Sequence, residues 1–171
     1  MVRIPALLAI ALSGFALHCP TRAAAQTGIA NSWTVGNKTI VATEVSNQPL
    51  QANTPDWRLR ASAVTEDAQG RHVHTLSVFF GVAQIPGPGR YHIVSADSAL
   101  HADEAAFIAK GSWQDGAYWS YSSTGTGNHY LTVTVRNGRV EIAMPPAPAY
   151  SDDATGGGIY IGAQLVETEG K

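Results

Sequence analysis

Short runs of alternating apolar and polar residues, each ended by a turn signal, occupy most of the chain after residue 30. In the clearest run, four apolar residues share one face of an extended strand: Trp57, Leu59, Ala61 and Ala63. No alternation of strand and helix patterns and no internal repeat interrupts these runs. The pattern therefore predicts an all-β fold, either an antiparallel β-sandwich or a small β-barrel of about eight to ten strands.

Glycine, asparagine and proline predict where these strands end. Gly36-Asn37 suits a tight hairpin, and Asn137-Gly138 predicts a type I′ turn, which needs positive φ at both central residues. Residues 45–55 and 145–157 are polar or rich in proline and glycine, so both are expected to be loops. Residues 96–110 predict one short helical turn followed by a strand that begins near residue 105.

The first 25 residues have the pattern of a cleavable secretion signal. Arg3 precedes an apolar run over residues 4–17, which is shorter than the roughly twenty residues needed to span a bilayer. Small residues at 23–25 fit cleavage after Ala25. We therefore expect a signal peptide over 1–25, a single β domain over 26–171, no further transmembrane segment, and a periplasmic or secreted location.

Removal of this segment would change the chemistry of the chain. The single cysteine, Cys19, lies inside the predicted signal, so disulfides, thiol catalysis and thiolate metal sites are excluded from the mature chain. Lipidation of Cys19 is the alternative, but His18 stands where lipoprotein processing prefers a small residue. Without Arg3 and Arg22, nine of the 11 Lys and Arg remain against 13 Asp and Glu, a net charge of −4. Because no basic run occurs, the composition argues against nucleic acid or a polybasic membrane contact.

His72 and His74 form the first candidate site. Residues two apart in a strand point the same way, so both imidazoles would stand on one face of the strand predicted over 71–82. They could bind zinc or copper together with a third ligand, for which the candidates are His92, His101 and Asp103. The alternative is two polar side chains on a half-exposed strand, because no second metal-binding motif occurs in the sequence.

Residues 113–130 combine aromatic side chains with glycine and amide residues. Aromatic surfaces beside hydrogen-bonding groups are how β domains grip sugar rings. Tyr118 and Trp119 are neighbours that point to opposite faces, so at least one is expected in the core, whereas Trp113 is expected to be exposed in a turn. The candidate ligand-binding residues are Trp113, Tyr118, Trp119, Asn128 and His129.

Motifs of known catalytic sites are missing from the sequence. It contains no Gly-x-Ser-x-Gly, no His-Glu-x-x-His and no phosphate-binding glycine loop. Asp103-Glu104, Asp115 and Asp152-Asp153 lack EF-hand spacing, so we expect them to be solvated loop charges. We therefore expect no catalytic residue, and no cofactor unless His72 and His74 bind zinc or copper.

Two segments carry a resemblance to other proteins: Gly-Pro-Gly-Arg-Tyr at 87–91, and Leu-Thr-Val-Thr-Val at 131–135 before the Asn-Gly hairpin. Their succession resembles small exported bacterial β-sandwich domains of unknown function, which implies a fold but no site residues.

We expect a non-enzymatic domain of the cell envelope that binds a protein or glycan partner through loops 111–116, 122–129 and 145–157. Two alternatives stay open. One is a lipocalin-like barrel that holds a small apolar ligand, and the other is a hydrolase or metal-dependent enzyme that uses His72, His74 and a carboxylate.

Overall fold

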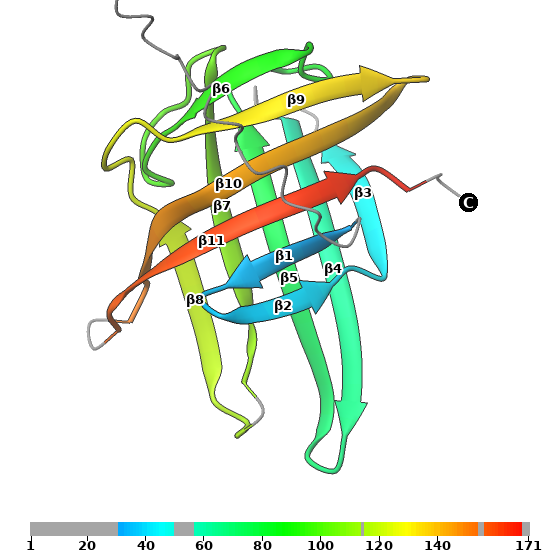
Figure 1. Ribbon diagram of the computed structural model, residues 1–171, viewed down its shortest axis with the longest axis vertical. Coiled ribbons are helices and arrows are strands. Elements are labelled where there is room, and N and C mark those ends of the chain that lie inside the picture. Colours follow the sequence, from blue (N-terminus) through cyan, green and yellow to red (C-terminus); the bar gives the residue numbers. More distant parts are fainter. Residues whose placement is uncertain (1–30, 50–56, 114, 154–155, 169–171) are drawn as a thin grey trace, which may run out of the picture.

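The computed structural model describes residues 31–49, 57–113, 115–153 and 156–168. These residues form eleven β-strands and no helix, which confirms the all-β prediction (Figure 1). The strands are β1 (Ser32–Val35), β2 (Lys38–Val41), β3 (Glu44–Pro49), β4 (Trp57–Asp67), β5 (Gly70–Phe80), β6 (Gly89–Ile93), β7 (Glu104–Ser112), β8 (Tyr118–Ser123), β9 (Tyr130–Arg136), β10 (Arg139–Ser151) and β11 (Gly158–Val166).

Two further predictions concern a short helical turn and a signal peptide, and the described residues include only the segment of the first. The expected helical turn before residue 105 is wrong, because the chain makes non-helical turns there. The predicted signal peptide lies outside the described residues. Within the described ranges, no helix has the length and apolar character needed to cross a membrane.

Five strands close into a barrel, in the order β10, β9, β6, β7, β8 and back to β10. All neighbours are antiparallel except β6 and β7, which run parallel. Three strands continue the sheet on each side of this barrel: β11, β1 and β2 follow β10, while β5, β4 and β3 follow β7. The chain therefore combines the two predicted architectures, a closed barrel whose sheet extends into two layers.

The two layers cross at a steep angle, as in orthogonally packed β-sandwiches (Figure 1). We name β9, β10, β11, β1 and β2 the front layer, and β3, β4, β5, β7 and β8 the back layer. The front layer ends at β2, which is the first strand of the sheet path. In Figure 1 the front layer runs across the view and the back layer runs from top to bottom behind it.

β10 belongs to both layers because it bends. It pairs with β9 through residues 139–143 and with β8 through residues 149–151. Its register against β11 shifts between Met144 and Ala147, and Pro145 and Pro146 lie at this shift, where a missing backbone N–H removes no regular ladder bond. The loop predicted from residue 145 is therefore wrong as far as Ser151. The loop predicted from residue 45 is also wrong as far as residue 49, because β3 occupies those positions.

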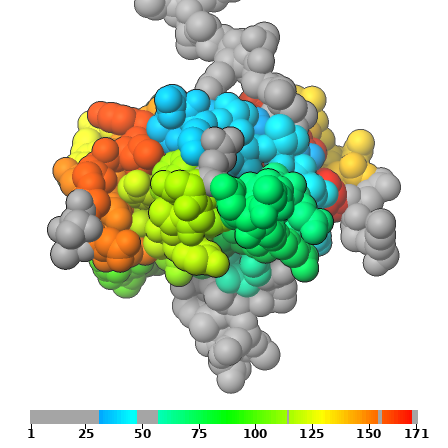
Figure 2. All heavy atoms as spheres, turned by 90° about the horizontal axis from the view of Figure 1, so that it is seen from below, coloured from blue at the N-terminus to red at the C-terminus, as the bar shows by residue number. Residues whose placement is uncertain are grey.

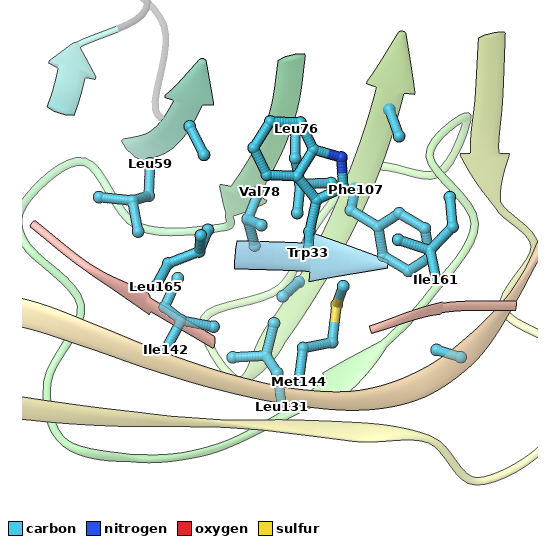
Figure 3. Close-up of a cluster of buried hydrophobic side chains, with 14 of the residues drawn as sticks. Trp33, Leu59, Leu76, Val78, Phe107, Leu131, Ile142, Met144, Ile161 and Leu165 are labelled. Carbon is cyan, nitrogen blue, oxygen red and sulfur yellow. The ribbon is translucent and has the colours of Figure 1, made fainter. Parts of the chain in front are cut away.

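Side chains from both layers fill the space between them. Trp33 of β1 is fully buried and lies against Leu76 and Phe107 of the back layer (Figure 3). The front layer contributes Leu131, Ile142, Met144, Ile161 and Leu165. The inward face predicted for residues 57–64 is confirmed, since Trp57, Leu59, Ala61 and Ala63 are all buried. The barrel interior is thus a packed core.

Both predicted two-residue hairpins form, with different turns. Asn137 and Gly138 have φ of 52° and 76°, as a type I′ turn requires. In the β1–β2 hairpin only Gly36 has positive φ, 60°, which matches the first central position of a type II′ turn. This turn fixes the register of β2, the strand that ends the front layer.

Replacing Phe107 with alanine should lower the free energy of unfolding by about 3–5 kcal/mol, because the fully buried ring leaves a cavity in the core. Urea denaturation followed by tryptophan fluorescence measures the change. Tyr118→Ala on the adjacent strand β8 is the control. That side chain is 87% exposed, so its loss should change stability by no more than about 0.5 kcal/mol. Equal losses in the two variants would contradict the described core.

Candidate functional site

The back layer extends past the end of the front layer. β4 and β5 are 11 residues each, and their hairpin projects beyond β2, as does the β7–β8 hairpin (Figure 1). Seen from below, the β1–β2 hairpin lies beside the ends of these two projecting hairpins (Figure 2). Between them is a hollow of about 540 Å³, which we name the hairpin pocket. Its lining residues are 38–41 of β2, Trp113 of the β7–β8 connection, and Thr65, Asp67, His72, His74, Ser112 and Trp119 of the back layer.

The inner face of the back layer changes from apolar to polar where the front layer ends. On β5, the residues under the front layer are Phe80, Val78 and Leu76, and those beyond it are His74 and His72. On β4 the change comes one inward position later, because the buried Ala63 pairs with His74 and the first polar residue, Thr65, pairs with His72. Buried positions favour apolar side chains, while polar groups are tolerated where water or a hydrogen-bond partner is available. The pocket floor is therefore a continuation of the core face.

Asp67, His72 and Ser112 form a hydrogen-bonded chain at one side of the pocket. His72 Nε2 lies 2.8 Å from Asp67 Oδ1, and His72 Nδ1 lies 2.6 Å from Ser112 Oγ. With Nε2–H donating to the carboxylate, a neutral imidazole accepts the serine hydroxyl at Nδ1. This hydrogen bond from His72, followed by that from the Gln69 N–H, holds the pKa of Asp67 below its ordinary value. The chain joins the tip of the β4–β5 hairpin to the end of β7.

His74 and Trp119 form the back wall of the pocket. Their rings are stacked, with centroids 6.1 Å apart and an angle of 22° between the planes. His74 Nδ1 lies against Gly111, where an added Cβ would come within 2.4 Å of that nitrogen. Glycine at this position therefore makes room for the stack. Burial lowers the pKa of His74, and electrostatic interactions with His72 and Lys38 lower it further.

Trp113 forms the side wall, together with Lys38 of β2. Its ring centroid lies 5.1 Å from that of Trp119, and Lys38 Nζ lies 4.4 Å from the Trp113 centroid, a cation–π distance. A second hollow of about 430 Å³ shares Lys38 and Trp113 with the hairpin pocket. Trp113 lies in the turn between β7 and β8 as expected, where its carbonyl accepts a hydrogen bond from Gly116 N–H, but it is half-buried and the expectation of an exposed side chain is wrong. Its contact with Trp119 explains the burial.

The structure brings four of the seven candidate residues together. His72, His74, Trp113 and Trp119 all line the hairpin pocket. Tyr118 is exposed, as expected for the neighbour of a buried Trp119. Asn128 and His129 lie on the connection from β8 to β9, where the His129 carbonyl accepts a hydrogen bond from Ile93 N–H, and they do not line the pocket.

The sequence interpretation missed five polar residues of the pocket: Lys38, Thr39, Thr65, Asp67 and Ser112. Asp67 could have been found by extending the alternation of residues 57–64 to positions 65 and 67 on the same face. Lys38 and Ser112 carry no such signal. Lys38 comes near the histidines only because the two layers cross, and Ser112 only because β7 pairs with β5, a strand far from it in the sequence.

The geometry limits how His72 could bind a metal ion. Both of its ring nitrogens are hydrogen-bonded, so a metal ion would have to displace Asp67 or Ser112. His92 pairs with Glu104 at the start of β7, whereas His74 lies beside Gly111 near its end. Across the described ranges, no cluster of three or more His, Cys, Asp and Glu side chains could hold a metal ion. Zinc or copper binding by His72 and His74 stays a prediction.

The pocket offers aromatic ring faces, an ammonium group, a carboxylate, a hydroxyl and imidazole within one hollow. Such a set suits a ligand group that has an apolar face and polar substituents at its edge. Comparison with known proteins finds no family model, no curated protein and no solved structure that matches the chain.

The imidazole of His74 should titrate below its ordinary pKa of 6.5. Because protonation is harder in the folded state, the unfolded chain takes up the proton first. The stability held by neutral His74 is therefore complete above pH 6.5 and is lost as the pH falls through 6.5 toward the folded-state pKa. Two-dimensional ¹H–¹⁵N spectra of the imidazole resonances measure the midpoint. His74→Gln assigns the signal, and a midpoint at or above 6.5 would contradict the described burial.

Proposed function

We propose that this chain is an exported, non-enzymatic binding domain of the cell envelope, which takes a ring-bearing group of its partner into the hairpin pocket. The observation that carries this proposal is the convergence of His72, His74, Trp113 and Trp119 on one hollow. These residues come from separate parts of the chain and lie where a sheet face continues beyond its cover. The predicted signal peptide supports the location.

Several properties of the pocket suit a ring. Its volume of about 540 Å³ lies within the range of ligand sites, roughly 300–1,000 Å³. Trp113 and Trp119 offer aromatic surface, while Lys38, Asp67 and Ser112 offer hydrogen bonds at the edge of a bound group. Both sugar rings and aromatic side chains have this combination of apolar face and polar edge.

Two buried polar atoms of the back wall strengthen the proposal. Trp119 Nε1 and His74 Nδ1 have no hydrogen-bond partner among the described residues. A buried polar group without a partner costs about 1–3 kcal/mol, which stability alone does not favour. The two stacked rings form a flat aromatic wall at the pocket, and a binding role for that wall would account for keeping the two unpartnered atoms there.

Two soluble probes, N-acetyl-tyrosinamide and peptidoglycan fragments released by lysozyme, test the proposal. We expect at least one of them to bind and to shift the NMR signals of Trp113, Trp119 and His74. Trp113→Ala should weaken that binding about tenfold, since an aromatic contact contributes roughly 0.5–1.5 kcal/mol beyond its buried area. Tyr118→Ala, an exposed aromatic residue outside the pocket, is the matched control and should bind as the parent does.

The same titration separates this proposal from binding through the loops at 122–129. Shifts confined to Asn128 and His129, with Trp113→Ala unaffected, would overturn the hairpin pocket as the site. Absence of binding by both probes would count against ring recognition as such.

A serine hydrolase is the second candidate, favoured by the chain from Asp67 through His72 to Ser112. In this reaction Ser112 Oγ adds to an acyl carbon and its proton passes to His72 Nδ1, while Asp67 stabilises the imidazolium. The proton then goes to the leaving group, and water releases the acyl group to restore the serine. Ser112 is only 5% exposed, which limits how an acyl group could reach it.

A fluorophosphonate probe tests this second candidate, because it labels activated serines covalently. We expect no labelling of Ser112 if the hydrogen-bonded chain only fastens the β4–β5 hairpin to β7. Labelling that disappears in Ser112→Ala and in His72→Gln would instead establish a nucleophilic serine. Intact-protein mass spectrometry measures the adduct, and the unfolded protein serves as the unreactive control.

A further inference from the structure

The two ends of the sheet differ in whether their edges are covered. At β3, Val45 N–H donates to Thr168 Oγ1 at 3.3 Å, and Thr168 N–H donates to the Val45 carbonyl at 2.8 Å. The segment that follows β11 thus protects this edge. At β2, no described strand pairs with the outer edge, because the sheet path ends there. An edge of this kind presents unpaired N–H and C=O groups to any extended chain beside it.

The hairpin register identifies which groups of β2 face outward. In a two-residue hairpin, the residues that flank the turn form a hydrogen-bonded pair, and bonded pairs then alternate along the strands. Val35 with Lys38 and Trp33 with Ile40 are the bonded pairs by this rule. Thr39 and Val41 therefore direct their N–H and C=O groups away from β1, and both residues line the hairpin pocket.

We propose that the hairpin pocket receives an extended peptide segment of a partner protein, which adds as a strand to β2 and inserts one aromatic or large aliphatic side chain beside Trp113 and Trp119. This inference rests on the proposed function and goes beyond it by naming the chemical class of the partner. Strand addition of this kind takes affinity from main-chain hydrogen bonds and specificity from pockets for alternate side chains.

The projecting hairpins provide the floor that such a strand needs. A strand paired with β2 would lie about 4.8 Å from it, over the part of the back layer that the front layer leaves uncovered. Alternate side chains of the peptide would point into the hairpin pocket, toward the back wall of His74 and Trp119 and the side wall of Trp113. The other side chains would continue the surface formed by Val41, which is 50% exposed.

For a peptide that pairs antiparallel with β2, the charges of the pocket select a composition. β2 runs from Lys38 toward Val41, so a peptide antiparallel to β2 brings its carboxyl end to Lys38. Asp67 is the last residue of β4, and in Figure 1 that strand ends on the same side of the view as β2, away from the start of β2 at Lys38. The complementary peptide has an acidic residue toward its carboxyl end, a basic residue toward its amino end, and an aromatic or large aliphatic residue between them.

A second copy of this chain fits the edge less well than a peptide. β2 is four residues long, whereas stable interfaces bury about 800 Å² on each partner. A copy paired through β2 about a two-fold axis would also bring its own projecting hairpins into the space that the first pair occupies (Figure 1). One extended segment avoids both problems.

The test begins with selection of a phage-displayed random heptapeptide library on the full protein. Selected peptides are then synthesised with N-methyl groups on alternate residues. Methylation of the amides that face β2 should weaken binding at least tenfold, whereas methylation of the other set should change it less than about threefold. Thr39→Pro, which removes one outward N–H from an edge strand, should weaken peptide binding similarly. Circular dichroism checks that this variant folds, and the methylated peptides carry the test if it does not.

Three results would overturn the inference. The first is a selection that yields no peptide whose binding depends on Trp113. The second is equal tolerance of both methylation patterns, which would mean that only a side chain enters the pocket. The third is self-association in sedimentation that Thr39→Pro abolishes, which would make a second copy the occupant. In each case N-acetyl-tyrosinamide binding reports separately on the proposed function, which fails only if neither that probe nor the peptidoglycan fragments use the pocket.

Discussion

The front layer covers the back layer only as far as β2, and the hairpin pocket forms at that edge. Under the cover, Trp33 packs against Leu76 and Phe107, and burial of their apolar surface holds the layers together. Beyond it, the same sheet face continues for the remaining length of β4 and β5. An apolar continuation there would be an exposed apolar patch, so polar side chains that hydrogen-bond to one another occupy much of it. The pocket therefore forms where the inward face of the back layer becomes accessible to solvent.

Close packing at Gly111 gives this exposed face a rigid wall. The missing side chain lets the His74 ring lie against β7 and stack on Trp119, and Trp119 in turn contacts Trp113. The chain through Asp67, His72 and Ser112 fixes the neighbouring hairpin at its tip. Without these side-chain hydrogen bonds, only the backbone hydrogen bonds between β4 and β5 would hold the tip of the projecting hairpin in position. Contacts within the protein therefore hold the pocket walls in place, and a ligand of the proposed site would have less entropy to remove on binding.

The sequence predicted the strand faces better than it predicted the loops. Alternation of apolar and polar residues identified the inward face of residues 57–64, because a period of two is a direct property of extended backbone. The failures were Val45 and Ala147, which lie in segments with turn-like composition yet are buried in strands. In both, pairing with a distant strand outweighed local preference, and β10 accommodated its prolines through a bulge.

By itself, the sequence determined the all-β class, the Asn137-Gly138 turn and the shared face of His72 and His74, since each depends on neighbours within a few residues. Only the tertiary structure decided that Trp113 and Trp119 meet those histidines while Asn128 and His129 do not. It also decided that Lys38 and Ser112 line the pocket and that no described strand pairs with the outer edge of β2. These features depend on how far one layer extends past another and at what angle they cross. Local patterns carry no record of either quantity, because both arise from pairings between strands far apart in the chain.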